Sequence, residues 1–111
     1  MIKNFLGSQK KALRKDGFTV KLYELSEELY RIDAYNIGFI PNLVIVAKDK
    51  TEIPVSFAEP PKIEFLKKGT DFDYFVDIEF ESGTLYVTTF SCFRYKLDIP
   101  SGQLHFSKEV G

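Results

Sequence analysis

The first fifteen residues carry apolar side chains at helical spacing. Apolar positions recur every three or four residues along 2–14, and cations occupy the opposite side. The pair Asp16-Gly17 follows, and a glycine in the left-handed conformation often ends a helix. The sequence therefore predicts a short N-terminal helix over 1–16. Its apolar side holds Ile2, Phe5, Leu6, Gln9, Ala12 and Leu13, and its basic side Lys3, Lys10, Lys11, Arg14 and Lys15.

After Gly17 the hydrophobic period changes to two. Alternation over 18–23 and 30–35 predicts two strands. The continuous β-branched run 43–47 predicts a strand covered on both faces, and 63–65 predicts a further short strand. We therefore expect one mainly β domain over 1–111: an antiparallel β-sandwich or strongly bent sheet over 18–107, with the single N-terminal helix packed on it.

The alternation is most complete over 71–81. Successive side chains of a strand point to opposite faces. The even positions are all apolar or aromatic, whereas five of the six odd positions are carboxylates. This predicts a core face made of Phe72, Tyr74, Val76, Ile78 and Phe80. It also predicts an acidic face made of Asp71, Asp73, Asp77, Glu79 and Glu81, with Phe75 in the remaining odd position.

The pair Ser82-Gly83 favours a two-residue hairpin loop after this strand. The register that follows pairs Glu81 with Thr84, Glu79 with Tyr86, Asp77 with Thr88 and Phe75 with Phe90. Residues 84–99 are expected to continue as one long bent strand. Pro100-Ser101-Gly102 then favours a second hairpin loop, with the glycine in the left-handed conformation.

The predicted acidic face is the main functional signal in the sequence. Its carboxylates have few cations near them in the predicted register, so like charges repel along the strand. Aromatic side chains surrounded by charges suit a protein interface in which the aromatics anchor and the charges steer a basic partner. The alternative is a solvated strand face that keeps the sheet edge from pairing. The predicted partner-binding residues are Asp71, Asp73, Phe75, Asp77, Glu79, Glu81, Tyr86 and Phe90.

Composition and charge indicate the cellular compartment in which we expect the protein. The chain of 111 residues has a net charge of −1 and one cysteine, Cys92, so it forms no internal disulfide. The apolar stretch 37–47 is interrupted by Pro41 and is too short to span a membrane, and the N-terminus lacks a signal-peptide pattern. We expect a cytoplasmic protein. The basic side of the predicted helix is either a membrane or nucleic-acid contact or a solvated face. The apolar side of the helix is too thin for stable binding at a membrane surface, and the acidic face of the sheet repels phosphate, so we expect neither a membrane nor a nucleic-acid partner.

The sequence offers little material for catalysis. His105 is the only histidine, and no nucleophile lies near it in sequence. One histidine and one cysteine do not make a zinc site. Asp71, Asp73 and Asp77 could in principle bind a hard cation such as calcium or magnesium. A straight strand, however, spreads these ligands along a line and does not wrap them around an ion. We therefore expect no enzyme activity, no cofactor and no metal.

One segment resembles a known group of proteins. Phe93-Arg94-Tyr95-Lys96-Leu97-Asp98-Ile99-Pro100-Ser101-Gly102-Gln103-Leu104 resembles the closing hairpin of small bacterial immunity proteins, including the partners of contact-dependent growth inhibition toxins. The resemblance implies a cytosolic monomer that forms a 1:1 heterodimer with a cognate toxin, often a nuclease with a basic active site. Such an inhibitor covers that site. The alternative function is a small-ligand or peptide-binding β module, with Phe75, Tyr86 and Phe90 lining a pocket.

Overall fold

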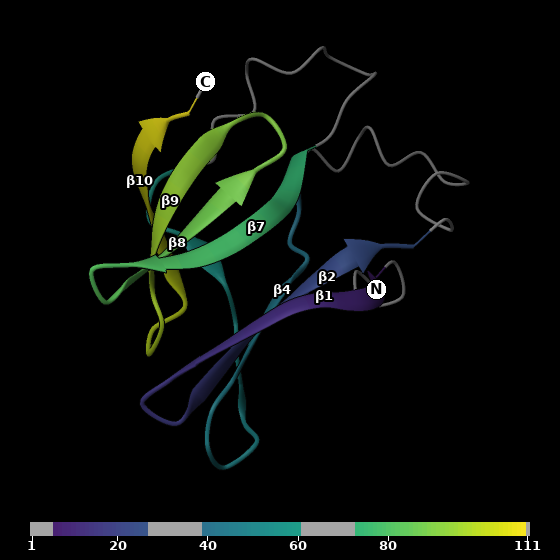
Figure 1. Cartoon of the computed structure of the whole chain (residues 1–111), viewed down its shortest axis with the longest axis vertical. Helices are drawn as coiled ribbons and strands as arrows, with labels where there is room; N and C mark the ends of the chain where they lie inside the picture. The colour runs from purple at the N-terminus through teal and green to yellow at the C-terminus, as the bar shows by residue number, and fades with distance from the viewer. Residues whose placement is uncertain (1–5, 27–38, 61–72, 111) are drawn as a thin grey trace.

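The computed structural model describes residues 6–26, 39–60 and 73–110, and these form two curled β-sheets that face each other (Figure 1). The first sheet has the order β1-β2-β4-β5 and the second β3-β7-β8-β9-β10-β6. The first sheet consists of β1 (Leu6–Lys15), β2 (Phe18–Leu25), β4 (Leu43–Val46) and β5 (Glu52–Ile53). The second consists of β3 (Phe39–Ile40), β7 (Asp73–Glu81), β8 (Thr84–Thr89), β9 (Phe93–Asp98), β10 (Gln103–Glu109) and β6 (Ser56–Phe57).

The mainly β, sandwich-like fold predicted from the sequence is confirmed. Pairing is antiparallel except for two short contacts, β3 with β7 and β6 with β10, which are parallel. The expected strands over 30–35 and 63–65 lie outside the described residues. The strand predicted over 43–47 is present, but only one of its faces is fully buried, because Leu43 and Ile45 face the core whereas Val44 and Val46 are half-buried.

The prediction of an N-terminal helix over 1–16 is wrong. Within the described residues the segment is strand β1, paired antiparallel with β2 through contacts such as Leu13 opposite Val20. Asp16 and Gly17 have φ angles of 51° and 84°. Two successive positive φ angles make the tight turn that joins twisted antiparallel strands, and Asp-Gly is among its most favoured pairs. The dipeptide therefore closes a hairpin and does not end a helix.

The two hairpin turns predicted from the sequence, at Ser82-Gly83 and Pro100-Ser101-Gly102, are present. Ser82 and Gly83 have φ angles of 52° and 80° and join β7 to β8, and Gly102 has a φ of 74° between β9 and β10. The prediction of a single long strand over 84–99 is wrong, because a turn separates β8 from β9. Cys92 donates its amide to the carbonyl of Thr89 at 3.0 Å in that turn.

The hydrophobic core lies between the sheets. The first sheet contributes Val20, Leu22, Leu43 and Ile45, and the second contributes Phe75, Ile78, Leu85, Val87, Phe93, Tyr95, Leu97, Ile99 and Leu104. All of these are less than a tenth exposed. Burial on this scale orders both sheets as one packed unit.

Candidate binding surface

The first residues of β7 turn inward because of a β-bulge. The register with β8 shifts between Phe75 and Asp77, so Phe75 lies opposite Thr89 and not opposite Phe90. A bulge inserts one unpaired residue, which reverses the inward and outward phase of the strand. Odd positions therefore face the core before the bulge and solvent after it. Phe75 is accordingly 1% exposed and lies in the core.

Buried Asn42 explains why the bulge forms there. Its Nδ2 donates to the carbonyl oxygens of Tyr23 (2.7 Å) and Phe75 (2.8 Å), and its Oδ1 accepts from the amide of Phe75 at 2.8 Å. The side chain thus replaces a strand partner for Phe75 and links the two sheets. Satisfying both backbone groups makes burial of this segment possible.

Asp73 is a structural residue. It is 2% exposed, and its carboxylate accepts hydrogen bonds from the amides of Tyr74 (2.9 Å) and Ser91 (3.1 Å) and from the Ser91 hydroxyl. It therefore fixes the turn after β8 to the start of β7. A carboxylate held in this way cannot contact a partner, so its predicted place in the interface is wrong. Asp71 lies outside the described residues.

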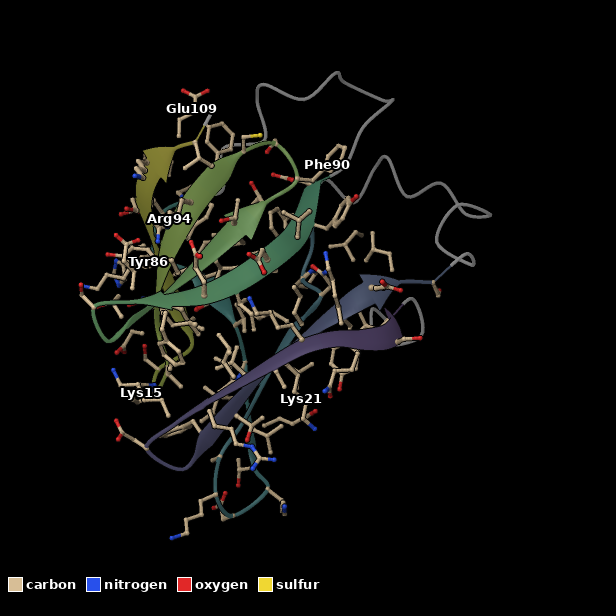
Figure 2. All side chains as sticks on the ribbon, in the orientation of Figure 1. Lys15, Lys21, Tyr86, Phe90, Arg94 and Glu109 are labelled. Carbon is tan, nitrogen blue, oxygen red and sulfur yellow. The ribbon has the colours of Figure 1, made fainter. Side chains whose placement is uncertain are left out.

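The predicted aromatic centre of the acidic face is also wrong. Phe75 packs in the core against Phe39, with ring centroids 5.0 Å apart. Phe90 stacks on Tyr74 at 5.2 Å and is 59% exposed. In Figure 2, Phe90 lies at the far end of β8 from Tyr86. Phe75, Tyr86 and Phe90 therefore do not line one pocket, because Phe75 points inward and the other two are apart on the outer surface.

What remains after the bulge is a shorter acidic patch, defined here as Asp77, Glu79, Glu81 and Tyr86. The three carboxylates occupy alternate positions on the outer side of β7, and their side chains are 50%, 54% and 62% exposed, in that order. The predicted register holds in this part of the hairpin: Glu79 lies opposite Tyr86, Asp77 opposite Thr88 and Glu81 opposite Thr84. The structure therefore brings together four of the eight predicted residues.

Arg94 organises this patch from the neighbouring strand β9. Its guanidinium lies 3.9 Å from the ring centre of Tyr86, and its side chain is 10% exposed (Figure 2). One terminal nitrogen contacts Glu79 Oε1 at 3.4 Å and Glu81 Oε2 at shorter range. The hydrogen bond from Arg94 lowers the pKa of Glu81, and the bond to Glu81 raises the pKa of Arg94. Stacking and ion pairing thus hold both glutamates in place.

Cations of β1 reach the other side of the same strand. Lys11 Nζ contacts Asp77 Oδ1 at 3.2 Å, Lys10 Nζ donates to the carbonyl of Val76 at 2.9 Å, and Lys15 Nζ donates to the carbonyl of Gly83. Lys10 and Lys11 are offset by 66 residues from their partners and Lys15 by 68, so β1 runs parallel to β7. We call this contact the lysine seam. The sequence-based expectation that few cations lie near the acids is therefore wrong, because Lys11 pairs with Asp77 in addition to the contacts that Arg94 makes.

Sequence reasoning misplaces Arg94 and misses Lys11, for different reasons. Extending the predicted register without the bulge puts Arg94 opposite Asp71, at the far end of the acidic strand from Glu81. Lys11 was assigned to a helix, so nothing in the pattern indicated that it faces β7. Arg94 lies opposite Thr88 across the β8–β9 hairpin, a pairing that the predicted single strand over 84–99 excluded.

Other chemistry is sparse among the described residues. No group of three His, Cys, Asp or Glu side chains there is arranged to hold a metal ion. His105 and Cys92 are exposed and lie on different strands or turns. The described part of the chain also contains no helix with the length and hydropathy to cross a membrane.

Comparison with protein-family models, curated proteins and solved structures finds no significant match to this chain. Its function must therefore be argued from the surface itself.

Proposed function

We propose that this protein is a cytoplasmic binding protein of the bacterial immunity type, which inhibits a basic toxin enzyme by placing the acidic patch against it. The observation that carries the proposal is the ordered cluster of Glu79, Glu81, Tyr86 and Arg94 on a rigid sheet. Two exposed carboxylates share one cation, so the cluster keeps a net negative charge and further acceptor capacity.

Preorganisation is the physical reason why this cluster suits binding. A free glutamate loses rotamer freedom when it pairs with a partner, and that loss opposes association. Here Arg94 has already fixed both glutamates, so a guanidinium or ammonium group of the partner meets acceptors in place. Tyr86 adds a flat aromatic surface of the kind that often anchors interfaces.

Charge is also segregated between the sheets. Residues 73–110, which form most of the second sheet, contain six Asp or Glu and three Lys or Arg. This segment therefore carries a net charge of −3 although the whole chain carries −1, and the cations of the lysine seam offset it only along one edge of β7. A negative field speeds encounter with a basic protein and repels phosphate, which supports a protein partner and opposes a nucleic-acid partner here.

The test uses the protein encoded next to this gene, co-expressed and then titrated. Glu79→Gln together with Glu81→Gln removes two charges at nearly constant shape. Glu109→Lys is the matched control, since Glu109 is exposed on β10 of the same sheet (Figure 2). We expect a 1:1 complex, loss of inhibition and a slower association rate for the glutamine variant, and unchanged behaviour for the control.

Salt dependence separates this proposal from its alternatives. The association rate should fall as salt screens the patch, while the dissociation rate changes less. An association rate that does not respond to salt, or a complex that the glutamine variant forms as tightly as wild type, rules out the acidic patch as the contact surface.

A further inference from the structure

The outer face of the first sheet carries a groove opposite in charge to the acidic patch. A hollow of about 570 Å³ lies beside the β1–β2 turn, and five cations and one carboxylate line it. A second hollow of about 350 Å³ adjoins it, shares Lys21 and Val46, and has one carboxylate, Glu52, in its lining, so the excess of positive charge lies in the first hollow. Because the second hollow reaches Leu6 and Tyr23, at the other end of the hairpin, the two form one groove along the strands.

The strand register explains which side chains reach this groove. Lys21 lies between Ala12 on β1 and Val44 on β4. Lys21 and Val44 alternate with buried neighbours, and Ala12 is exposed between half-buried ones, so all three point away from the core. Thr19 is placed in the same way beside Arg14 and Val46, one step along the sheet. The floor is therefore aliphatic, and cations stand along it.

The β4–β5 turn adds two lysines to the same place. A Cβ added to Gly17 would lie 3.5 Å from Cβ of Lys48, so this turn packs directly over the β1–β2 turn. Lys48 and Lys50 are both exposed. Asp49, between them, accepts a hydrogen bond from the amide of Thr51 at 3.0 Å, which holds its carboxylate within the turn. We call the set of Arg14, Lys21, Lys48 and Lys50 around Val44 and Val46 the basic groove.

The cations of the groove differ from those of the lysine seam in one respect. Lys10, Lys11 and Lys15 each have a hydrogen-bonding partner on β7 or the turn after it. By contrast, no ion pair within the described residues involves Arg14, Lys21, Lys48 or Lys50. Four unpaired cations beside one another repel, so an anionic partner that sits among them is stabilised.

We propose that the basic groove binds an extended acidic peptide segment of another protein, one in which acidic and aliphatic residues alternate. Side chains two apart on a strand are spaced about 7 Å from each other, and Val44 and Val46 have this spacing along the floor. An extended peptide repeats at the same interval. Its aliphatic residues bury against the valines while its carboxylates meet the cations. This proposal is independent of the acidic patch.

Two observations favour a peptide over a nucleic acid. The exposed phenylalanines of the described residues, Phe80 and Phe90, do not line the groove. The aromatic side chains that do line it, Phe18 and Tyr23, are half-buried and five residues apart on β2, too far from each other to stack neighbouring bases. The valine floor also needs apolar groups to cover it, and a sugar-phosphate backbone supplies few. Residues 73–110 carry a net charge of −3, which opposes a long polyanion that extends from the groove over the second sheet.

The experiment titrates the full chain into two fluorescein-labelled probes and follows anisotropy. One probe is a peptide that alternates Glu and Val, and the other is a single-stranded oligonucleotide of equal charge. We expect saturable peptide binding, weakened about tenfold or more by Lys21→Glu and by Lys48→Glu, as loss of a charged hydrogen bond does. Lys96→Glu, the same charge change on the second sheet, should leave the affinity unchanged. Circular dichroism and melting curves check that each variant is folded.

Three results overturn the proposal. Absence of saturable peptide binding means that the groove is only a solvated basic face. Tighter binding of the oligonucleotide means that it recognises phosphate. Equal weakening by Lys96→Glu means that the probe senses overall charge and not the groove. If the basic groove is the peptide site, Glu79→Gln with Glu81→Gln should leave peptide binding intact. The groove and the acidic patch are therefore tested separately.

Discussion

Gly102 offers the sharpest test of the packing between the β9–β10 turn and the chain segment before β6. Its φ of 74° lies in the left-handed region, where a side chain destabilises the backbone by about 1–2 kcal/mol. A Cβ at this position would also overlap the carbonyl oxygen of Pro54 and lie 3.2 Å from Cγ2 of Ile53. The contact is with backbone that a hydrogen bond from the Ser56 amide to the Gly102 carbonyl (2.9 Å) holds in place.

Gly83 isolates the steric part of this effect. It has a similar φ of 80°, but an added Cβ would meet nothing within 4 Å. Gly83→Ala should therefore lower the free energy of unfolding by about 1–2 kcal/mol through conformation alone. Gly102→Ala should lower it by about 1–3 kcal/mol more, because overpacking forces the backbone to shift.

Urea denaturation followed by tyrosine fluorescence measures both variants, since the chain has six tyrosines and no tryptophan. The midpoint should fall in the order wild type, Gly83→Ala, Gly102→Ala, with little change in slope. Equal loss of stability in the two variants would contradict the close approach of Pro54 to the turn.

Three further predictions follow from buried and paired groups. Phe75→Ala should lower the free energy of unfolding by about 3–5 kcal/mol because it empties the core, whereas Phe90→Ala should lower it by about 1 kcal/mol, the loss of one exposed stack; thermal melts of the pair compare them. Asp73→Ala should destabilise the protein by about 1–3 kcal/mol, measured in the same way, because it leaves buried donors without an acceptor. Glu81 has a pKa below its usual 4.5, so its ion pair with Arg94 stabilises the fold above that pH and is lost as the pH falls. Melting temperatures across acidic pH should drop less steeply for Glu81→Gln than for wild type, and parallel curves would show that the pair does not contribute.

The sequence predicted the β7–β8 hairpin where local information defines it. Ser82-Gly83 set the loop, and the matched apolar pattern set the pairs next to it, so Glu81, Glu79 and Asp77 have the predicted partners. The prediction stopped being right at the bulge before Asp77. The bulge is caused by Asn42, which is 33 residues away from Phe75 in sequence, so the local hydrophobic pattern does not reveal it.

The N-terminal segment shows the opposite problem. Its spacing of apolar residues is compatible with a helix, and residues 6–15 alone do not exclude a strand. The structure resolves the ambiguity through distant partners: Leu13 packs on the core, and Lys11 pairs with Asp77. Asp16-Gly17 was the available clue, because this pair is a stronger signal for a hairpin than for a helix end. Tertiary contacts override local propensity in such segments.

The lysine seam covers part of a strand edge that could otherwise pair with another chain. Among residues 6–26, 39–60 and 73–110, no strand pairs with the outer edge of β7 beyond Tyr74, and an open strand edge is a template for pairing with another chain. Ammonium groups from β1 occupy that edge at Val76 and at the turn after β7. Because the protecting lysines belong to a different sheet, protection depends on the β1–β2 hairpin staying docked. Local detachment of that hairpin, without global unfolding, is therefore the event that exposes an aggregation-prone edge.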